Sequence, residues 1–166
     1  MTVQEDLAAI ERQERDLQFE RFSEDDAWRL GCLLRDWGLE QRAPIVVDVR
    51  RFDRPLFFTA LTGSVPDNTE WVRRKSNVVV RFHRSSYGMG RQLALDEVSL
   101  ESRYGLSFAD YAAHGGSFPI AIRGLGPIGS VTVSGLPQRD DHDLVVRALC
   151  GMLNRSVDDY ALPQVT

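Results

Sequence analysis

Two pairs of adjacent β-rich segments constrain the fold of this chain most strongly. Residues 44–52 and 54–61 are separated by a short turn, and so are residues 117–123 and 127–134. Strands joined by such short connections pair in an antiparallel direction. A brief alternation of apolar and polar residues over 17–21 predicts a fifth strand. We therefore expect an α+β fold with a single, mostly antiparallel five-stranded sheet flanked by helices.

Helical spacing of apolar residues predicts the elements that flank this sheet. Thr2 and Ser23 fit N-caps of the first two helices. No repeat or linker composition divides the chain, so we expect one domain over 1–166, with an N-terminal helix within 1–16 and an aperiodic tail over 155–166. The predicted helices are 3–15, one that starts at Ser23, 71–82, one or two within 91–113, and 140–153.

Composition places the chain among ordinary globular proteins. Apolar residues make up 43% and charged residues 27%, and no apolar run approaches the roughly 20 residues that span a bilayer. The acidic, amphipathic start lacks the features of a secretory signal. Cys32 and Cys150 lie in apolar helical patterns, which favours free thiols over a disulfide. We expect a cytoplasmic protein without a membrane partner.

One segment carries a local positive field. Residues 71–91 contain six Lys or Arg and no acid, although the net charge of the chain is −4. Arginine forks and lysine bind carboxylates or phosphates, so Arg74 and Lys75 are candidate ligands for a small anion. Lys75 shares the apolar face of its helix, and Asp48 is its expected buried partner. The alternative is a solvated or subunit-contacting basic face. The acidic total makes nucleic acid an unexpected partner.

Histidines, hydroxyls and glycines supply the other candidates. His83, Ser85 and Ser86 follow the basic helix, where they form either a helix end or a ligand or acid/base group. His114 precedes Gly115 and Gly116 at an expected helix end, which predicts a structural turn or a close approach of a ligand to the backbone.

A cluster of acids follows the last predicted strand. Asp140 to Asp143 includes His142, but successive helical side chains point about 100° apart and cannot converge on one metal ion. We therefore expect no metal site there. Asp140 or Asp141 fits an N-cap, with the remaining acids at the positive end of the helix dipole.

The segments 44–58, 115–122 and 128–135, with the Lys75 helix between them, carry a family resemblance. Over residues 20–155 the chain resembles the GlcG/HbpS-like family, often labelled the haem-degrading domain. This resemblance implies a profilin-like α/β fold and a higher oligomer built from dimers. It also implies haem as a ligand, with His83 or His114 as its axial ligand, and a pocket lined by the glycine pair.

These observations favour a cytosolic homo-oligomer that binds a small anionic ligand, with haem as the case that the family suggests. Two alternatives stay open. One is an enzyme acting on a small organic acid through Lys75, His83 or His114. The other is a multimeric adaptor that binds protein partners through its first helix.

Overall fold

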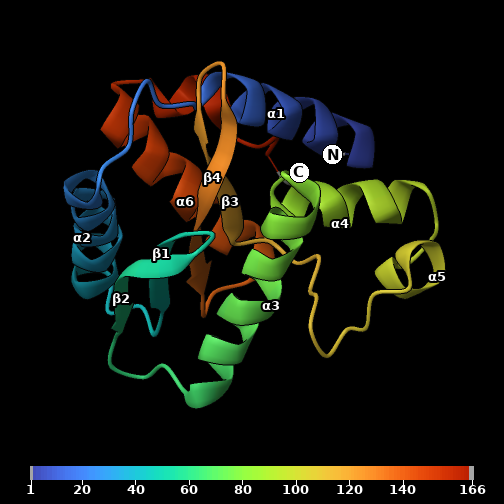
Figure 1. Ribbon diagram of the computed structural model, residues 1–166, viewed down its shortest axis with the longest axis horizontal. Coiled ribbons are helices and arrows are strands. Elements are labelled where there is room, and N and C mark those ends of the chain that lie inside the picture. Colours follow the sequence, from blue (N-terminus) through green and yellow to red (C-terminus); the bar gives the residue numbers. More distant parts are fainter. Residues whose placement is uncertain (1, 165–166) are drawn as a thin grey trace.

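The computed structural model describes residues 2–164, and a four-stranded antiparallel sheet lies at its centre (Figure 1). The strand order is β2-β1-β4-β3. Both predicted hairpins are confirmed, because β1 pairs with β2 and β3 pairs with β4. A third antiparallel pairing, β1 with β4, joins the hairpins. The strands are β1 (Val46–Arg51), β2 (Arg54–Ala60), β3 (Ser117–Ile122) and β4 (Gly126–Ser134).

The predicted fifth strand is wrong. Residues 17–21 form only one isolated bridge, in which Phe19 lies parallel to Ile122. Phe19 donates its N–H to Ala121 and accepts from Arg123, and then the chain leaves the sheet. Its exit is set by Ser23, whose side chain caps the next helix. The α+β class with one antiparallel sheet therefore holds, with four strands.

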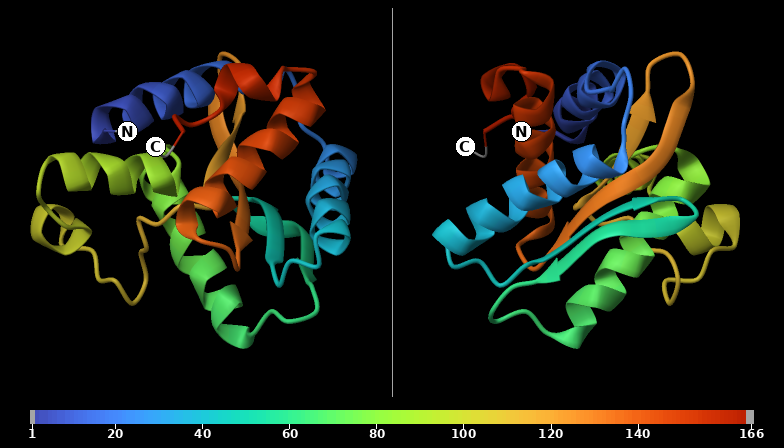
Figure 2. Two further views of the ribbon diagram at one scale, coloured as in Figure 1. Left: turned by 180° about the vertical axis from the view of Figure 1, so that it is seen from behind. Right: turned by 60° about the vertical axis from the view of Figure 1, so that its left-hand side comes forward.

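Helices cover both faces of the sheet. α2 (Glu24–Glu40) and α6 (Gln138–Leu153) lie on one face, and α3 (Pro66–Phe82) crosses the other (Figures 1 and 2). Gly31 allows close approach of α2, since a Cβ there would lie 2.3 Å from the Phe57 ring. The core is apolar and continuous from sheet to helices; its fully buried members include Leu30, Leu34, Ile45, Val47, Val49, Phe118, Ile120, Val131, Val133, Val145 and Leu149.

Local capping chemistry fixes where the helices begin. Both expected caps are confirmed: Thr2 caps α1 (Val3–Asp16) and Ser23 caps α2, each in a reciprocal capping box. Such caps satisfy N–H groups that have no partner inside the helix. α3 starts earlier than expected, at Pro66, and Asn68 Oδ1 accepts from the Val65 N–H at 2.9 Å.

The region 91–113 differs from the sequence expectation. It holds the end of α4 (Ser86–Leu95), the short α5 (Leu100–Tyr104) and then a loop over 105–116, where a second helix was expected. Gly105 ends α5 with a positive φ of 68°. The loop is fastened to α3 by polar bonds, including Asn77 Nδ2 to the Asp110 carbonyl at 2.8 Å and the Ala112 N–H to the Arg74 carbonyl at 3.1 Å.

The segment after α6 packs on its own chain. A 3-10 turn, η1 (Val157–Tyr160), lies beside α1. Gln13 Nε2 donates to the Tyr160 carbonyl at 2.6 Å, and Leu162 is buried with Ile10. Residues 165–166 of the predicted tail lie outside the described range, so the order found here applies to residues up to 164.

Candidate functional site

A buried ion pair lies between α3 and the start of α6. Lys75 is 3% exposed and its Nζ donates to Asp141 Oδ2 at 2.9 Å and to the Val133 carbonyl at 3.2 Å. Asp141 is 1% exposed, and its Oδ1 accepts from the Leu136 N–H at 3.0 Å. The predicted burial of Lys75 is confirmed, and its pairing with a carboxylate satisfies the rule for buried charges.

The predicted partner, Asp48, is wrong. Asp48 is buried on β1, but Arg50 donates to it through Nε at 2.7 Å and Nη2 at 2.8 Å. Residues two apart on a strand share one face, so Arg50 reaches Asp48 without any change of fold. The expected N-cap, Asp140 or Asp141, is also wrong, because α6 begins at Gln138 and Asp141 accepts from Lys75 inside its first turn.

Burial acts on both members of the pair in the direction of neutral groups. Desolvation lowers the pKa of Lys75, and the attraction to Asp141 opposes this shift. Desolvation raises the pKa of Asp141 to about 6, against the same attraction and its backbone hydrogen bonds. Both shifts describe a charge pair whose ionised form is penalised by loss of water. The characteristic feature of this site is therefore an amine and a carboxyl group in contact, both moved toward their neutral forms by burial.

His114 lies next to this pair, on the loop 105–116. Its ring is 5.2 Å from the Trp71 ring and 5.8 Å from the Phe108 ring. Its Nδ1 is buried and has no hydrogen-bond partner among the described residues. Burial, followed by the charges of Lys75 and Arg74, lowers the pKa of His114. The lowered pKa favours the neutral imidazole, whose Nδ1 has no hydrogen bond within the described chain.

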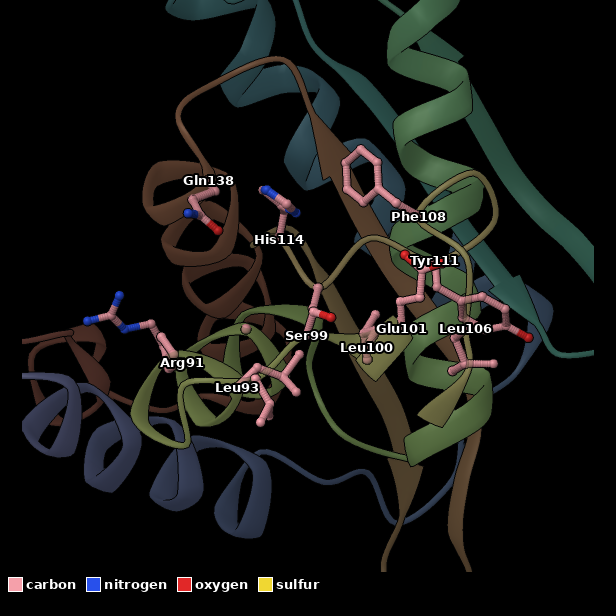
Figure 3. Close-up of a pocket in the computed structure, with 14 residues that line it drawn as sticks. Arg91, Leu93, Ser99, Leu100, Glu101, Leu106, Phe108, Tyr111, His114 and Gln138 are labelled. Atoms are coloured by element: carbon pink, nitrogen blue, oxygen red, sulfur yellow. The ribbon is translucent and has the colours of Figure 1, made fainter. Parts of the chain in front are cut away.

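Two adjoining cavities meet at His114 and Gln138. One has a volume of about 270 Å³, with Lys75, Asp141 and Trp71 in its wall. The second, about 420 Å³, lies between α4, α5 and the loop, and Figure 3 shows His114 and Gln138 toward the top of the view. These three elements and the turn between the two helices line it, with side chains that include Arg91, Leu93, Val98, Leu100, Glu101, Leu106, Phe108, Tyr111 and Ala113. The site therefore joins a polar chamber to a largely apolar one.

The glycine pair makes room for the chain itself. Gly116 has a φ of +133°, and a Cβ there would lie 2.3 Å from the Val133 carbonyl and 2.8 Å from Lys75 Nζ. At Gly115 a Cβ would lie 1.9 Å from the Gln138 carbonyl. These glycines stand in a turn that follows loop, not the helix end that was expected. They set the distance between the His114 loop and the Lys75–Asp141 pair.

The other predicted site residues lie outside both cavities. His83 is exposed, ends α3 with a φ of 55° and stacks on Phe52 at 5.8 Å. Ser85 caps α4, and its N–H donates to Glu14 Oε1 at 2.7 Å. Ser86 exchanges two hydrogen bonds with the Ser117 backbone. These contacts give each of the three residues a structural role.

The basic segment is divided among several partners. Arg73 reaches Asp110 at 3.0 Å, Arg84 reaches Glu14 at 3.4 Å, and Arg91 lies 3.1 Å from Asp6. Arg74 is different, because no carboxylate among residues 2–164 lies within ion-pair distance of it. Its guanidinium stacks over Trp71 at 4.2 Å and Phe108 at 5.1 Å, and these two rings line the polar and the apolar cavity respectively.

The acidic cluster at the start of α6 disperses as its helical spacing predicts. Asp141 faces Lys75, Asp143 accepts from Arg147 Nε at 3.2 Å, and His142 points into the core. His142 Nε2 contacts Gln13 Oε1 at 2.8 Å. No three His, Cys, Asp or Glu side chains in the described part of the chain gather into a metal-binding group.

Asp141, Gln138, Trp71 and Arg91 are the site residues that the sequence reasoning missed. The helical spacing places Trp71 on the same face as Lys75, four positions earlier, but it does not show that this face borders a cavity. The contribution of Gln138 and Asp141 depends on how α6 returns to α3, which no local pattern reports. Arg91 lies one helix further along, and its inward direction follows from the position of α4.

The chain belongs to the family described as "Haem degrading protein HbpS-like", which matches residues 22–150. Among curated proteins it is 54% identical over 164 residues to a UPF0303 protein of Acidobacterium capsulatum, with 99% of each chain covered. It is 49% identical over 162 residues to a UPF0303 protein of Sinorhizobium medicae, covering 98% of this chain and 99% of the relative. The family resemblance seen in the sequence is therefore confirmed.

Solved structures share the fold. The Ybr137w protein has a TM-score of 0.82 at 30% identity, with 89% of this chain and 87% of that chain covered. HbpS has a TM-score of 0.63 at 19% identity, covering 82% and 92%. A PduOC:haem complex has a TM-score of 0.65 at 16% identity, covering 82% and 97%. The described residues contain no helix both long and apolar enough to cross a membrane.

Proposed function

We propose that the protein binds a small molecule with an apolar body and an anionic group in the two cavities that meet at His114. The observation that carries this proposal is the buried Nδ1 of His114, which has no partner among residues 2–164. A buried polar atom without a hydrogen bond lowers the stability of the folded protein unless a water molecule or a ligand bonds to it. His114 lines both the apolar and the polar cavity, so a ligand that bonds to it would have an apolar part and a polar part.

Haem is the first ligand to test, because the residues present fit it. An unprotonated imidazole nitrogen is a common axial ligand of haem iron, and His114 is held neutral beside apolar walls. Arg91 lines the cavity, and its partner Asp6 also accepts from Arg139 at 2.9 Å, so that cluster keeps a net positive charge. Arg74 adds a second cation. Such cations suit the propionate groups of haem. The haem itself would supply redox chemistry when bound.

The relatives support the same ligand class. The family description names haem degradation, and one structural neighbour is a haem complex. The neighbour's low identity restricts that likeness to the fold, so the ligand assignment for this chain depends on His114 and the cavities. His83, the other histidine considered, is exposed and lies in neither cavity wall.

Titration with haemin tests this function directly. We expect the wild-type protein to shift the Soret band at a one-to-one ratio with the subunit. His114→Ala should weaken binding at least tenfold and change the band of any residual complex. His83→Ala is the matched control and should bind as the wild type does. Equal binding by the two variants, or none by the wild type, contradicts the haem assignment.

We also propose that the protein self-associates through the free edge of its sheet. β2 is an edge strand, and unpaired edges invite pairing with a second copy. Phe58, on this edge strand, is 50% exposed and offers an apolar side chain for contact with a second copy. Native mass spectrometry reports the subunit number directly, and a monomer at micromolar concentration would contradict this part of the proposal.

A further inference from the structure

The chain uses lysine once. Of its 20 Lys and Arg residues, 19 are arginine and the remaining one is Lys75. That single lysine is buried, whereas the other cations of its helix reach acids or the surface. Arginine stays charged under all protein conditions, but lysine can lose its proton and become a nucleophile. The only lysine therefore lies at a buried position, where loss of water favours the neutral amine that an arginine could not provide.

The geometry around Lys75 suits reaction with a ligand. Its side chain forms part of the wall of the 270 Å³ cavity, so a small molecule there can reach it. Two acceptors fix Nζ in place, the Val133 carbonyl and Asp141 Oδ2. Gly116 leaves the space beside Nζ free of a side chain. The amine is thus oriented, accessible from the cavity and in contact with a carboxyl group that can accept a proton.

Burial prepares the pair for this transfer. Loss of water lowers the pKa of Lys75 and raises that of Asp141 to about 6, so burial moves both groups toward their neutral forms. A lysine placed in this way is a typical nucleophile toward carbonyl groups. The second carboxylate contact, from Leu136 N–H to Asp141 Oδ1, keeps the acid aimed at the amine.

We propose that Lys75 forms an imine with a small 2-oxo acid held in the polar cavity. The nitrogen lone pair of the neutral amine attacks the carbonyl carbon, and the new C–N bond yields a carbinolamine. Asp141 gives a proton to the departing oxygen and takes one from nitrogen. The C–O bond breaks, water leaves with both original amine protons, and C=N remains. No oxidant or reductant is consumed.

Arg74 gives the reason for a 2-oxo acid over a neutral carbonyl compound. Its guanidinium has no carboxylate within ion-pair distance among the described residues, and it stacks on Trp71, which lines the cavity. Its charge is close enough to act on both Lys75 and His114. A substrate carboxylate beside the carbonyl would pair with Arg74 while the carbonyl carbon meets Nζ.

This inference stands apart from haem binding, although both sites share His114. It would survive a failed haem titration, because it depends on Lys75, Asp141 and Arg74. Conversely, haem binding by a protein that shows no amine reactivity would leave the proposed function intact. The two experiments therefore fail independently.

Reductive trapping provides the test, because the chain has only two amines: Lys75 and its α-amino group. The protein is incubated at pH 7 with pyruvate and cyanoborohydride, and the adduct is located by peptide mass spectrometry. Arg81→Lys supplies a matched control, since Arg81 is exposed on the same helix. An exposed lysine is more than about 99.9% protonated at pH 7. We expect at least tenfold more adduct on Lys75 than on the introduced amine.

Two comparisons complete the test. Arg74→Gln should lower the trapping of pyruvate severalfold relative to acetone, which has the carbonyl but no carboxylate. Asp141→Asn should slow adduct formation while leaving the amine in place. An unmodified Lys75 in a protein whose introduced amine is labelled overturns the proposal. An unchanged pyruvate-to-acetone ratio in Arg74→Gln overturns the assignment to 2-oxo acids.

Discussion

The core histidine His142 makes the stability of this protein depend on pH in a way that can be calculated. Its ring is fully buried between Tyr87 and Phe118, at 5.0 and 5.9 Å. Gln13 Nε2 donates to the Tyr160 carbonyl, so Gln13 Oε1 accepts from Nε2–H of His142. Nδ1 has no partner in the described chain. Burial, with a smaller effect of the Arg139 charge, lowers the pKa of His142 to about 3.

The sign of the effect follows from proton binding. In the unfolded chain the pKa of a histidine is about 6.5, so between pH 3 and 6.5 the unfolded state holds a proton that the folded state lacks. Acid therefore favours unfolding, and the contribution of His142 is complete above pH 6.5 and shrinks as the pH falls. Between pH 7.5 and 5 linkage gives a loss of about 2 kcal/mol from this one group.

Urea unfolding of the wild type and of His142→Phe over pH 5–7.5 measures this term. At pH 7.5 the variant should be the less stable protein, because the hydrogen bond to Gln13 is lost. Toward pH 5 the gap should close by about 2 kcal/mol, since phenylalanine has no proton to bind. The raised pKa of Asp141 has the opposite sign, but it is common to both proteins and cancels in their difference. A gap that is constant with pH refutes the reasoning.

Two further stability predictions concern the site. Asp141→Asn should destabilise by about 3 kcal/mol, because it leaves a buried lysine unpaired, whereas the double change with Lys75→Met should cost less; equal losses in urea unfolding would contradict this. Gly116→Ala should lower the thermal midpoint far more than Gly105→Ala. Both positions have positive φ, but only at Gly116 would the new Cβ meet a backbone oxygen, at 2.3 Å. Similar thermal midpoints for the two variants would show that the positive φ causes the destabilisation and that the contact with the backbone oxygen does not.

Local chemistry could be predicted from the sequence where the cause lies within a few residues. The capping boxes at Thr2 and Ser23 and the two hairpins depend on neighbours in the chain, and all are confirmed. The burial of Lys75 followed from its spacing along one helix face. The wrong strand prediction at 17–21 also came from a local signal, the alternation of apolar and polar residues. Whether a segment pairs with a neighbouring strand depends on the tertiary fold, and here only one bridge forms.

The site could not be assembled in the same way. The partner of Lys75 lies 66 positions further along the chain, and its choice over Asp48 depends on Arg50 and on the path of α6. The expected helix within 91–113 became a loop because Asp110 and its neighbours bond to α3. One signal for the site is present in the sequence itself. The only lysine of the chain lies on the apolar face of a predicted helix.

The placement of the site on two kinds of structure has an evolutionary consequence. Lys75 and Asp141 stand on helices that are anchored to the sheet, whereas His114, Phe108 and Tyr111 stand on the loop 105–116. Loops accept sequence change at little risk to the core that supports them. The ligand bound by this fold can therefore change through exchange of about twelve residues of one loop, without replacement of the amine–acid pair or of the helices that carry it.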